Sequence, residues 1–204
     1  AGFGLRAWAN DSHRPEAPFC YASPSLPIFD RNLKNLSEKI RPSCVLAHVR
    51  GVAYSPNVDV SLQNVHPFQF DGVRLAMAHN GDLAHIGKMK PLLARYVRPE
   101  FLGCIKGTTD SEWIYALIVS QLSAPDQRSN SAELVTAVES ALAIIREARA
   151  RCGISISSSV NLFLANGEQL AAVRYCFDFG CYPTGDPARV HEANLKFLSL
   201  WYTS

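Results

Sequence analysis

The sequence predicts an α+β fold, built as a four-layer αββα sandwich. Four apolar runs without helical spacing are interpreted as buried strands, paired as residues 44–49 with 73–78 and 160–165 with 170–175. Two strongly apolar helical segments, 111–122 and 132–151, lie between these pairs. Each sheet needs helices on one face and the other sheet on its opposite face, which gives four layers.

In the first half of the chain, apolar spacing and breaker residues define the elements. Residues 2–8 are predicted to form a short strand, whereas residues 10–25, rich in Pro, Ser and charge, are predicted to be a loop. Leu33, Leu36 and Ile40 have helical spacing, which predicts a helix over 32–40. The segment 79–81, His-Asn-Gly, has the composition of a turn after the strand at 73–78.

In the second half, a helix is predicted over 86–96, and Thr109 or Asp110 is suited to cap the helix at 111–122. Asn166-Gly167 between two apolar runs is a strong hairpin signal. Residues 177–193 are predicted to be irregular, and 197–202 a last strand. The 204 residues suit one substantial core, so residues 1–204 are predicted to form a single domain.

Composition excludes several classes of function. The net charge is +2 and no Lys/Arg run exceeds two residues, so no nucleic-acid partner is expected. The longest apolar run is too short to cross a membrane. The six cysteines form no CxxC pair, which favours reduced, buried thiols in a cytoplasmic protein. No set of His, Cys and acidic residues has metal-ligand spacing, so neither a metal nor another cofactor is predicted.

Four polar motifs stand at the ends of predicted elements: AHVRG (47–51), NVHPF (64–68), AHNG (78–81) and GTTDSE (107–112). Arg50 could bind a carboxylate with its guanidinium fork or simply extend into solvent. Asp110 could hold an ammonium group or only cap its helix. Together, an arginine and an aspartate match the two charged ends of a free amino acid.

Asn80 and Gly81 could supply a side-chain amide and a backbone N–H to an oxyanion hole, or could form an ordinary turn. His66 and His79 are interpreted as hydrogen-bonded structural residues rather than as acid/base groups. These alternatives stay open on the residues alone.

The four motifs, in this order, resemble the glutamine-binding half of class II glutamine amidotransferases, which are N-terminal-nucleophile hydrolases. The resemblance implies that Arg50 binds the glutamine carboxylate and Asp110 its α-amino group. It also implies that Asn80 and Gly81 form the oxyanion hole, and that the loop with Asn64 and His66 is mainly structural. GFGLRAW, KGTTDSEW and SLWYTS are similar to segments of the Dug-type glutathione-degrading subgroup and of ergothioneine-pathway amidohydrolases.

The resemblance also implies a function: hydrolysis of a γ-glutamyl amide, either glutamine or a γ-glutamyl peptide, by an N-terminal cysteine. This chain begins with Ala1, so it is expected to be truncated at both ends and inactive as given. Ala53 replaces a threonine of the family's pocket, which is expected to weaken binding. The alternative is a catalytically dead subunit with a scaffold or assembly role. Dug-type relatives work in a complex, which implies a protein partner.

Overall fold

Two antiparallel three-stranded sheets frame the structure, a computed structural model that describes residues 2–51 and 61–198. The first sheet has the order β2-β1-β3, formed by Gly2–Trp8 (β1), Phe19–Ser23 (β2) and Cys44–Arg50 (β3). The second has the order β4-β5-β6, formed by Ala76–Gly81 (β4), Ser158–Ala165 (β5) and Leu170–Phe177 (β6). The α-helices are Arg31–Ser37 (α1), Ile86–Leu93 (α2), Pro99–Leu102 (α3), Asp110–Gln121 (α4), Ser131–Arg151 (α5) and Pro187–Leu198 (α6).

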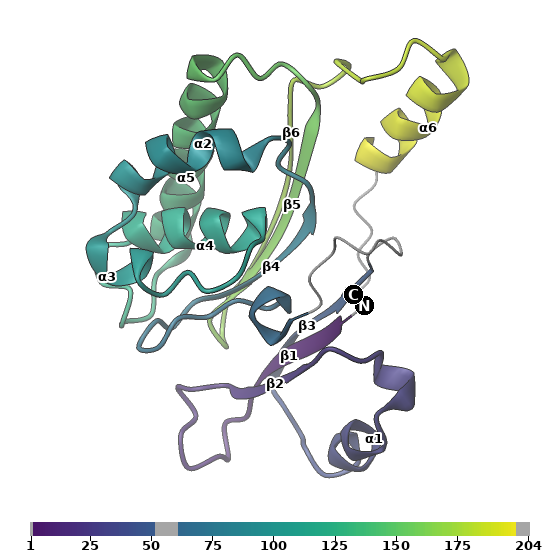
Figure 1. The fold of residues 1–204 in the computed structure, drawn as a ribbon. Helices are drawn as coiled ribbons and strands as arrows, with labels where there is room; N and C mark the ends of the chain where they lie inside the picture. Colours follow the sequence, from purple (N-terminus) through teal and green to yellow (C-terminus); the bar gives the residue numbers. More distant parts are fainter. Residues whose placement is uncertain (1, 52–60, 199–204) are drawn as a thin grey trace.

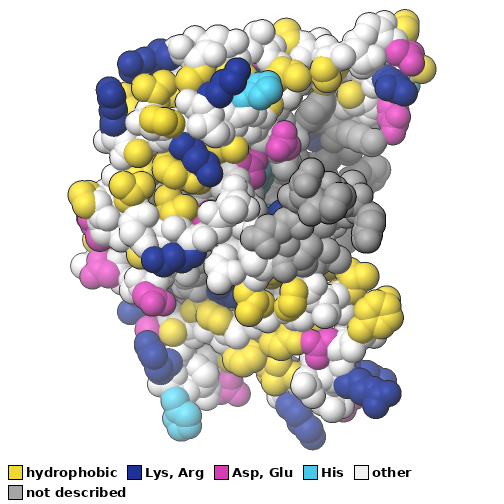
Figure 2. Space-filling view, in the orientation of Figure 1, with side chains coloured by type: hydrophobic (Ala, Val, Ile, Leu, Met, Phe, Trp, Pro, Cys, Tyr) yellow, Lys and Arg dark blue, Asp and Glu magenta, His cyan; other side chains and the backbone are white. Residues whose placement is uncertain are grey.

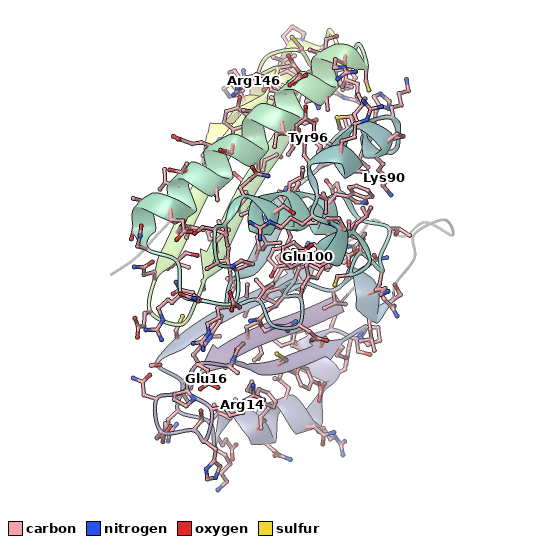
Figure 3. All side chains as sticks on the ribbon, turned by 90° about the vertical axis from the view of Figure 1, so that its left-hand side faces the viewer. Arg14, Glu16, Lys90, Tyr96, Glu100 and Arg146 are labelled. Carbon is pink, nitrogen blue, oxygen red and sulfur yellow. The ribbon has the colours of Figure 1, made fainter. Side chains whose placement is uncertain are left out.

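The layers stack in the order helices, second sheet, first sheet (Figure 1). Helices α2 to α5 cover the face of the second sheet that points away from the first, and Figure 3 shows the same layering from the side. The small helix α1 lies beyond the first sheet, on the side opposite the second sheet (Figures 1 and 3). The predicted α+β fold is confirmed.

Helix α4 is the centre of the main core, because all ten residues from 111 to 120 are buried. Helix α5 instead buries one stripe, including Leu134, Val138 and Ile145, against α4 and the second sheet. The space between the two sheets is filled by a separate small cluster consisting of Trp8, Leu46, Ala76, Ala78 and Ala165. Small alanines let the two sheets approach closely there.

The predicted pairing of strands is wrong for 44–49. This strand joins the first sheet, where β1 runs antiparallel to it from Gly2↔Arg50 to Trp8↔Cys44. The predicted partner segment 73–78 contributes to β4 in the second sheet. Part of the predicted loop 10–25 is also a strand, β2, because β1 pairs with it along Phe3↔Ser23 to Ala7↔Phe19. Local composition carries no information about such long-range pairing.

Two further predictions about local structure are corrected. Residues 79–81 are not a turn, because β4 continues through them with Asn80↔Asn161 and Gly81↔Val160 as pairs. The predicted irregular segment and last strand overlap α6, which is helical from Pro187 to Leu198, and residues 199–202 lie outside the described part. The helices at 32–40, 86–96, 111–122 and 132–151 and the Asn166-Gly167 hairpin are present, with ends shifted by a few residues.

The outer face of β3 is open, so 44–49 is buried on one side only. Val45 and Val49 are half exposed there, whereas Leu46 on the opposite face is buried. Figure 2 shows hydrophobic side chains gathered over the lower part of the molecule, where Figure 1 places the first sheet and α1. The inward face of β3 carries His48 and Arg50 toward the site described next.

Candidate functional site

A cavity of about 660 Å³ lies where the ends of β3 and β4 meet the start of α4. Arg50, Asn80, Gly81 and Asp110 all line it, together with three histidines from different segments. The four residues predicted from the sequence therefore share one cavity, although they come from both sheets and a helix. Their individual roles stay predictions.

Arg50, the last residue of β3, lines the cavity and has one unpaired donor. Its Nη1 donates to the backbone oxygen of Asn64 at 2.9 Å, which fixes the plane of the guanidinium. Its Nε is buried and has no hydrogen-bond partner among the described residues. A buried, unpaired guanidinium donor is costly unless an acceptor such as a carboxylate binds it.

Asp110 is the first residue of α4, but it is not the helix cap. Thr109 takes that role, with its hydroxyl accepting the N–H of Glu112 at 3.4 Å. The Asp110 carboxylate is instead oriented by the N–H of Ser111 at 2.8 Å and by that of Leu83 at 2.6 Å. The remaining lone pairs of this carboxylate can accept an ammonium group.

Asn80 and Gly81 end β4 at the mouth of the cavity, where both are exposed. The backbone oxygen of Asn80 accepts the side-chain amide of Asn161 at 2.9 Å. Pairing with β5 holds both residues in the sheet. The alternative of a free turn is thereby removed, while the oxyanion-hole role stays a prediction.

The GTTDSE loop is fixed by two buried side chains. The Glu112 carboxylate accepts the N–H groups of Lys106 at 3.0 Å and Gly107 at 2.7 Å. Asn64 accepts the N–H of Thr108 at 2.9 Å and donates to its hydroxyl at 3.1 Å. A Cβ on Gly107 would lie 2.4 Å from the Asn64 side-chain oxygen, so only glycine fits this approach. Asn64 therefore has the structural role that the resemblance implied.

Three histidines form a polar cluster in the cavity wall. His48 and His66 approach with their Nδ1 atoms 3.2 Å apart, and His79 Nδ1 lies 2.9 Å from the Ser111 hydroxyl. Burial, with added repulsion from His48, His79 and Arg50, lowers the pKa of His66 to about 2. Burial also lowers the pKa of His48 and of His79. The cluster is therefore neutral at physiological pH.

The buried neutral His66 makes the protein sensitive to acid. Because its folded pKa is below that of an unfolded histidine, the unfolded state binds the extra proton as pH falls below about 6.5. The stabilisation is complete above that pH and is lost progressively toward pH 2. Lowering pH from 7 to 5 should cost about 2 kcal/mol of unfolding free energy through His66 alone.

Urea unfolding across this pH range measures the effect. We expect His66→Gln to reduce the fall of unfolding free energy between pH 7 and pH 5. His13→Gln, at an exposed histidine, should leave that fall unchanged. The same fall of unfolding free energy in the parent protein and in both variants would contradict the role of His66 in acid sensitivity.

Asp82 is a cavity residue that the sequence reasoning missed. It directly follows Gly81, and burial together with the neighbouring Asp110 raises the pKa of its carboxyl. Its position directly after the predicted oxyanion pair could have identified Asp82 from the sequence. His48 was also missed, although its alternation with Arg50 along β3 places both on one face.

The cysteines lie outside the cavity lining. All six are free, so the prediction of reduced thiols agrees with the structure. Cys20 and Cys181 are exposed and the other four half-buried, so the predicted burial is wrong. Within residues 2–51 and 61–198, no group of three His, Cys, Asp or Glu side chains is placed to hold a metal ion. No described helix has the length and apolar character of a membrane span.

The fold is that of a class II glutamine amidotransferase domain. Residues 25–178 match the family model for glutamine amidotransferases class-II, and the chain belongs to that family. A curated relative, the probable glutamine amidotransferase DUG3 of Saccharomyces cerevisiae, is 33% identical over 122 residues. That match covers 59% of this chain and 33% of the yeast protein, so the chain spans a third of its relative's length.

A solved structure shares the fold. It is a glutamine aminotransferase class-II domain protein from Silicibacter pomeroyi, with a TM-score of 0.63 and 22% sequence identity. The similarity covers 85% of this chain and 69% of that one. The likeness agrees with the α+β fold of this chain.

Proposed function

We propose that the cavity binds the glutamyl part of a γ-glutamyl amide, and that the whole protein hydrolyses this amide. The observation that carries the proposal is the separation of charge within one cavity. The free Nε of Arg50 comes from the first sheet, and the oriented carboxylate of Asp110 comes from the helix above the second. A zwitterionic amino acid has a carboxylate and an ammonium group that complement this pair.

The chemistry requires a nucleophile beside the oxyanion groups. A cysteine thiolate would attack the γ-carbonyl carbon, and the negative oxygen would be held by the Asn80 amide and the Gly81 N–H. The amine would then leave with a proton, and water would release glutamate from the thioester. Loss of one oxyanion donor costs roughly 3 kcal/mol in measured cases, so Asn80 is expected to matter strongly for turnover.

None of the six cysteines can supply that nucleophile, since none lines the cavity. We expect residues 1–204 to bind L-glutamine and L-glutamate but to release no glutamate from glutamine or γ-glutamyl peptides. An enzymatic glutamate assay measures this directly. Turnover that disappears when an internal cysteine is replaced would contradict the site.

If the native polypeptide carries a segment before Ala1 that begins with cysteine, adding that segment should restore turnover. The second candidate function is a catalytically dead subunit with a scaffold role. Determining the N-terminal residue of the polypeptide from its native source separates the two: an N-terminal cysteine supports the enzyme, and another residue supports the subunit.

Substrate, partner and location are further parts of the proposal. The resemblance to Dug-type proteins favours a γ-glutamyl peptide such as glutathione, a protein partner and a cytoplasmic location. The cavity volume of about 660 Å³ is compatible with a peptide leaving group beside the glutamyl part. Relative affinities for glutamine and glutathione, measured by calorimetry, test the substrate part. Ala53, expected to weaken binding, lies outside the described residues.

A further inference from the structure

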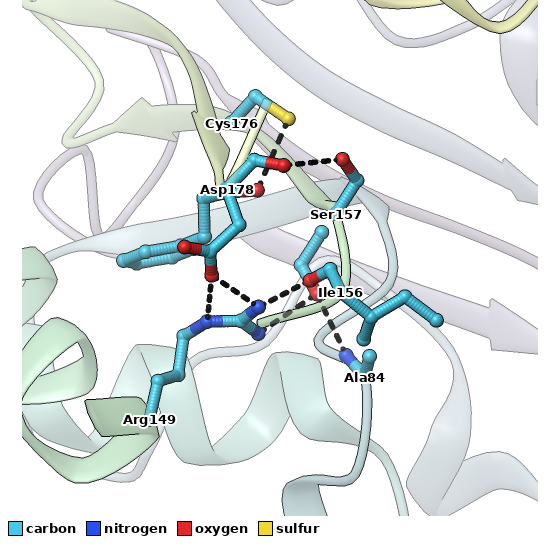
Figure 4. A network of polar contacts seen from close by, with 8 residues as sticks. Ala84, Arg149, Ile156, Ser157, Cys176 and Asp178 are labelled. Atoms are coloured by element: carbon cyan, nitrogen blue, oxygen red, sulfur yellow. Dashed lines mark hydrogen bonds and ion pairs between the residues drawn. The ribbon is translucent and has the colours of Figure 1, made fainter. Parts of the chain in front are cut away.

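We propose that Arg149 and Ser158 are positioning residues for the amino end of the ligand, acting through the loop that follows Gly81. The inference rests on the proposed function. Arg149 lies on α5 and Ser158 begins β5, and neither lines the cavity. Figure 4 shows the polar network that joins Arg149 to Ala84 of the loop.

Arg149 is the buried anchor of this network, with 2% of its surface exposed. It donates to Asp178 from Nε at 3.2 Å and from Nη2 at 2.8 Å, to the backbone oxygen of Ile156, and from Nη1 to the Ser158 hydroxyl at 2.9 Å. Asp178 adopts a left-handed backbone conformation, with φ 49°, and its carboxylate forms an ion pair with Arg149. The guanidinium therefore has one fixed orientation.

Ser158 connects Arg149 to the loop. Its oxygen accepts two N–H groups, one from Arg149 and one from the backbone of Ala84 at 3.0 Å. Both lone pairs are occupied, so the hydroxyl oxygen cannot swing away from Ala84 without breaking its bond to Arg149. A buried polar network of this kind holds its members rigidly when all are satisfied.

The loop from Asp82 to Ala84 is held at each N–H group. Asp82 donates to the Ser159 oxygen at 3.1 Å, Leu83 to the Asp110 carboxylate at 2.6 Å, and Ala84 to Ser158. Leu83 thus orients the carboxylate predicted to bind the ammonium group, and Ala84, its neighbour, is held by Ser158. Loosening Ala84 releases the Leu83 N–H from Asp110, while the Arg50 end of the cavity is untouched.

The prediction is a loss of affinity restricted to ligands with an α-ammonium group. By calorimetry, Ser158→Ala should weaken L-glutamate binding about tenfold, yet change binding of glutarate, which lacks the ammonium, less than twofold. Arg149→Met should act similarly, and Arg149→Lys should recover part of the loss. A merely structural role would weaken both ligands alike.

Ser120→Ala is the matched control. Ser120 is also buried and also accepts a backbone N–H at 3.0 Å, from Arg98, but it lies at the far end of α4 from the cavity. It should leave the preference for glutamate over glutarate unchanged. Equal preferences in Ser158→Ala, Ser120→Ala and the parent protein would overturn the inference.

Amide hydrogen exchange separates this inference from the proposed function. In Ser158→Ala, the amide hydrogens of Leu83 and Ala84 should exchange at least tenfold faster than in the parent protein. Ser120→Ala should show no such change. If the parent protein binds no γ-glutamyl ligand, the proposed function fails, and exchange at these two amides alone decides whether Ser158 positions the loop. Unchanged exchange rates of the Leu83 and Ala84 amides in Ser158→Ala would overturn the positioning role of Ser158.

Discussion

Replacement of Arg50 by alanine is expected to weaken L-glutamate binding about a hundredfold. Arg50 lines the cavity, and its Nε is buried and lacks a partner among the described residues, so a ligand carboxylate that reaches this guanidinium is bound largely away from water. Losing one partner of a desolvated charge pair costs roughly 2–5 kcal/mol, and 1.4 kcal/mol corresponds to tenfold in affinity. Arg50→Lys, which keeps the charge but not the fork, should lose less.

A ligand without the α-carboxylate provides the control. 4-Aminobutyrate should bind the parent protein weakly and should bind Arg50→Ala with similar affinity. Because Arg50 also donates to Asn64, a purely structural effect would weaken both ligands together. That result in titration calorimetry would contradict the carboxylate-binding role.

Gly81→Ala is expected to be the most destabilising single substitution near the site. A Cβ at this position would lie 2.0 Å from the backbone oxygen of Ser159 and 2.7 Å from His79 Nε2. Strand β4 would have to separate from β5, which also breaks the bond from Asp82 to Ser159. Such overpacking costs about 3 kcal/mol, which lowers Tm by roughly 6–12 °C in a domain of this size.

Gly87→Ala is the matched control, since a Cβ there meets nothing within 4 Å and the residue lies in α2. Its stability should rise by about 0.5 kcal/mol, because alanine has the better helix propensity. Thermal unfolding of both variants measures the contrast. A Gly81→Ala protein as stable as Gly87→Ala would show that β4 and β5 are not packed as described.

The sequence predicted local elements better than their partners. Leu134, Val138 and Ile145 revealed α5 through their spacing, and Asn166-Gly167 revealed the β5–β6 hairpin. The assignment of β3 to the first sheet could not be predicted, because its pairing with β1 joins residues about forty positions apart. The outward Val45 and Val49 made β3 resemble a strand buried on both faces.

At the site, the charged residues were predictable and their surroundings were not. Arg50 and Asp110 stand in recognisable motifs, so sequence alone nominated them, and the cavity brings them together. Asp82 and Leu83 lie near Asp110 because β4 continues through residues 79–81. The sequence predicted a turn at 79–81, so this neighbourhood could not be predicted. Arg149 lies about 70 positions after the end of β4 and about 100 after the end of β3, and no local sequence pattern connects it to either strand.

A crystal structure of the protein with bound L-glutamate tests the central claim most directly. We predict the ligand's α-carboxylate within hydrogen-bond distance of Arg50 Nε, its ammonium on the Asp110 carboxylate, and its γ-carboxylate toward Asn80 and Gly81. Glutamate bound outside this cavity, or bound inside it with its α-carboxylate away from Arg50, would contradict the account.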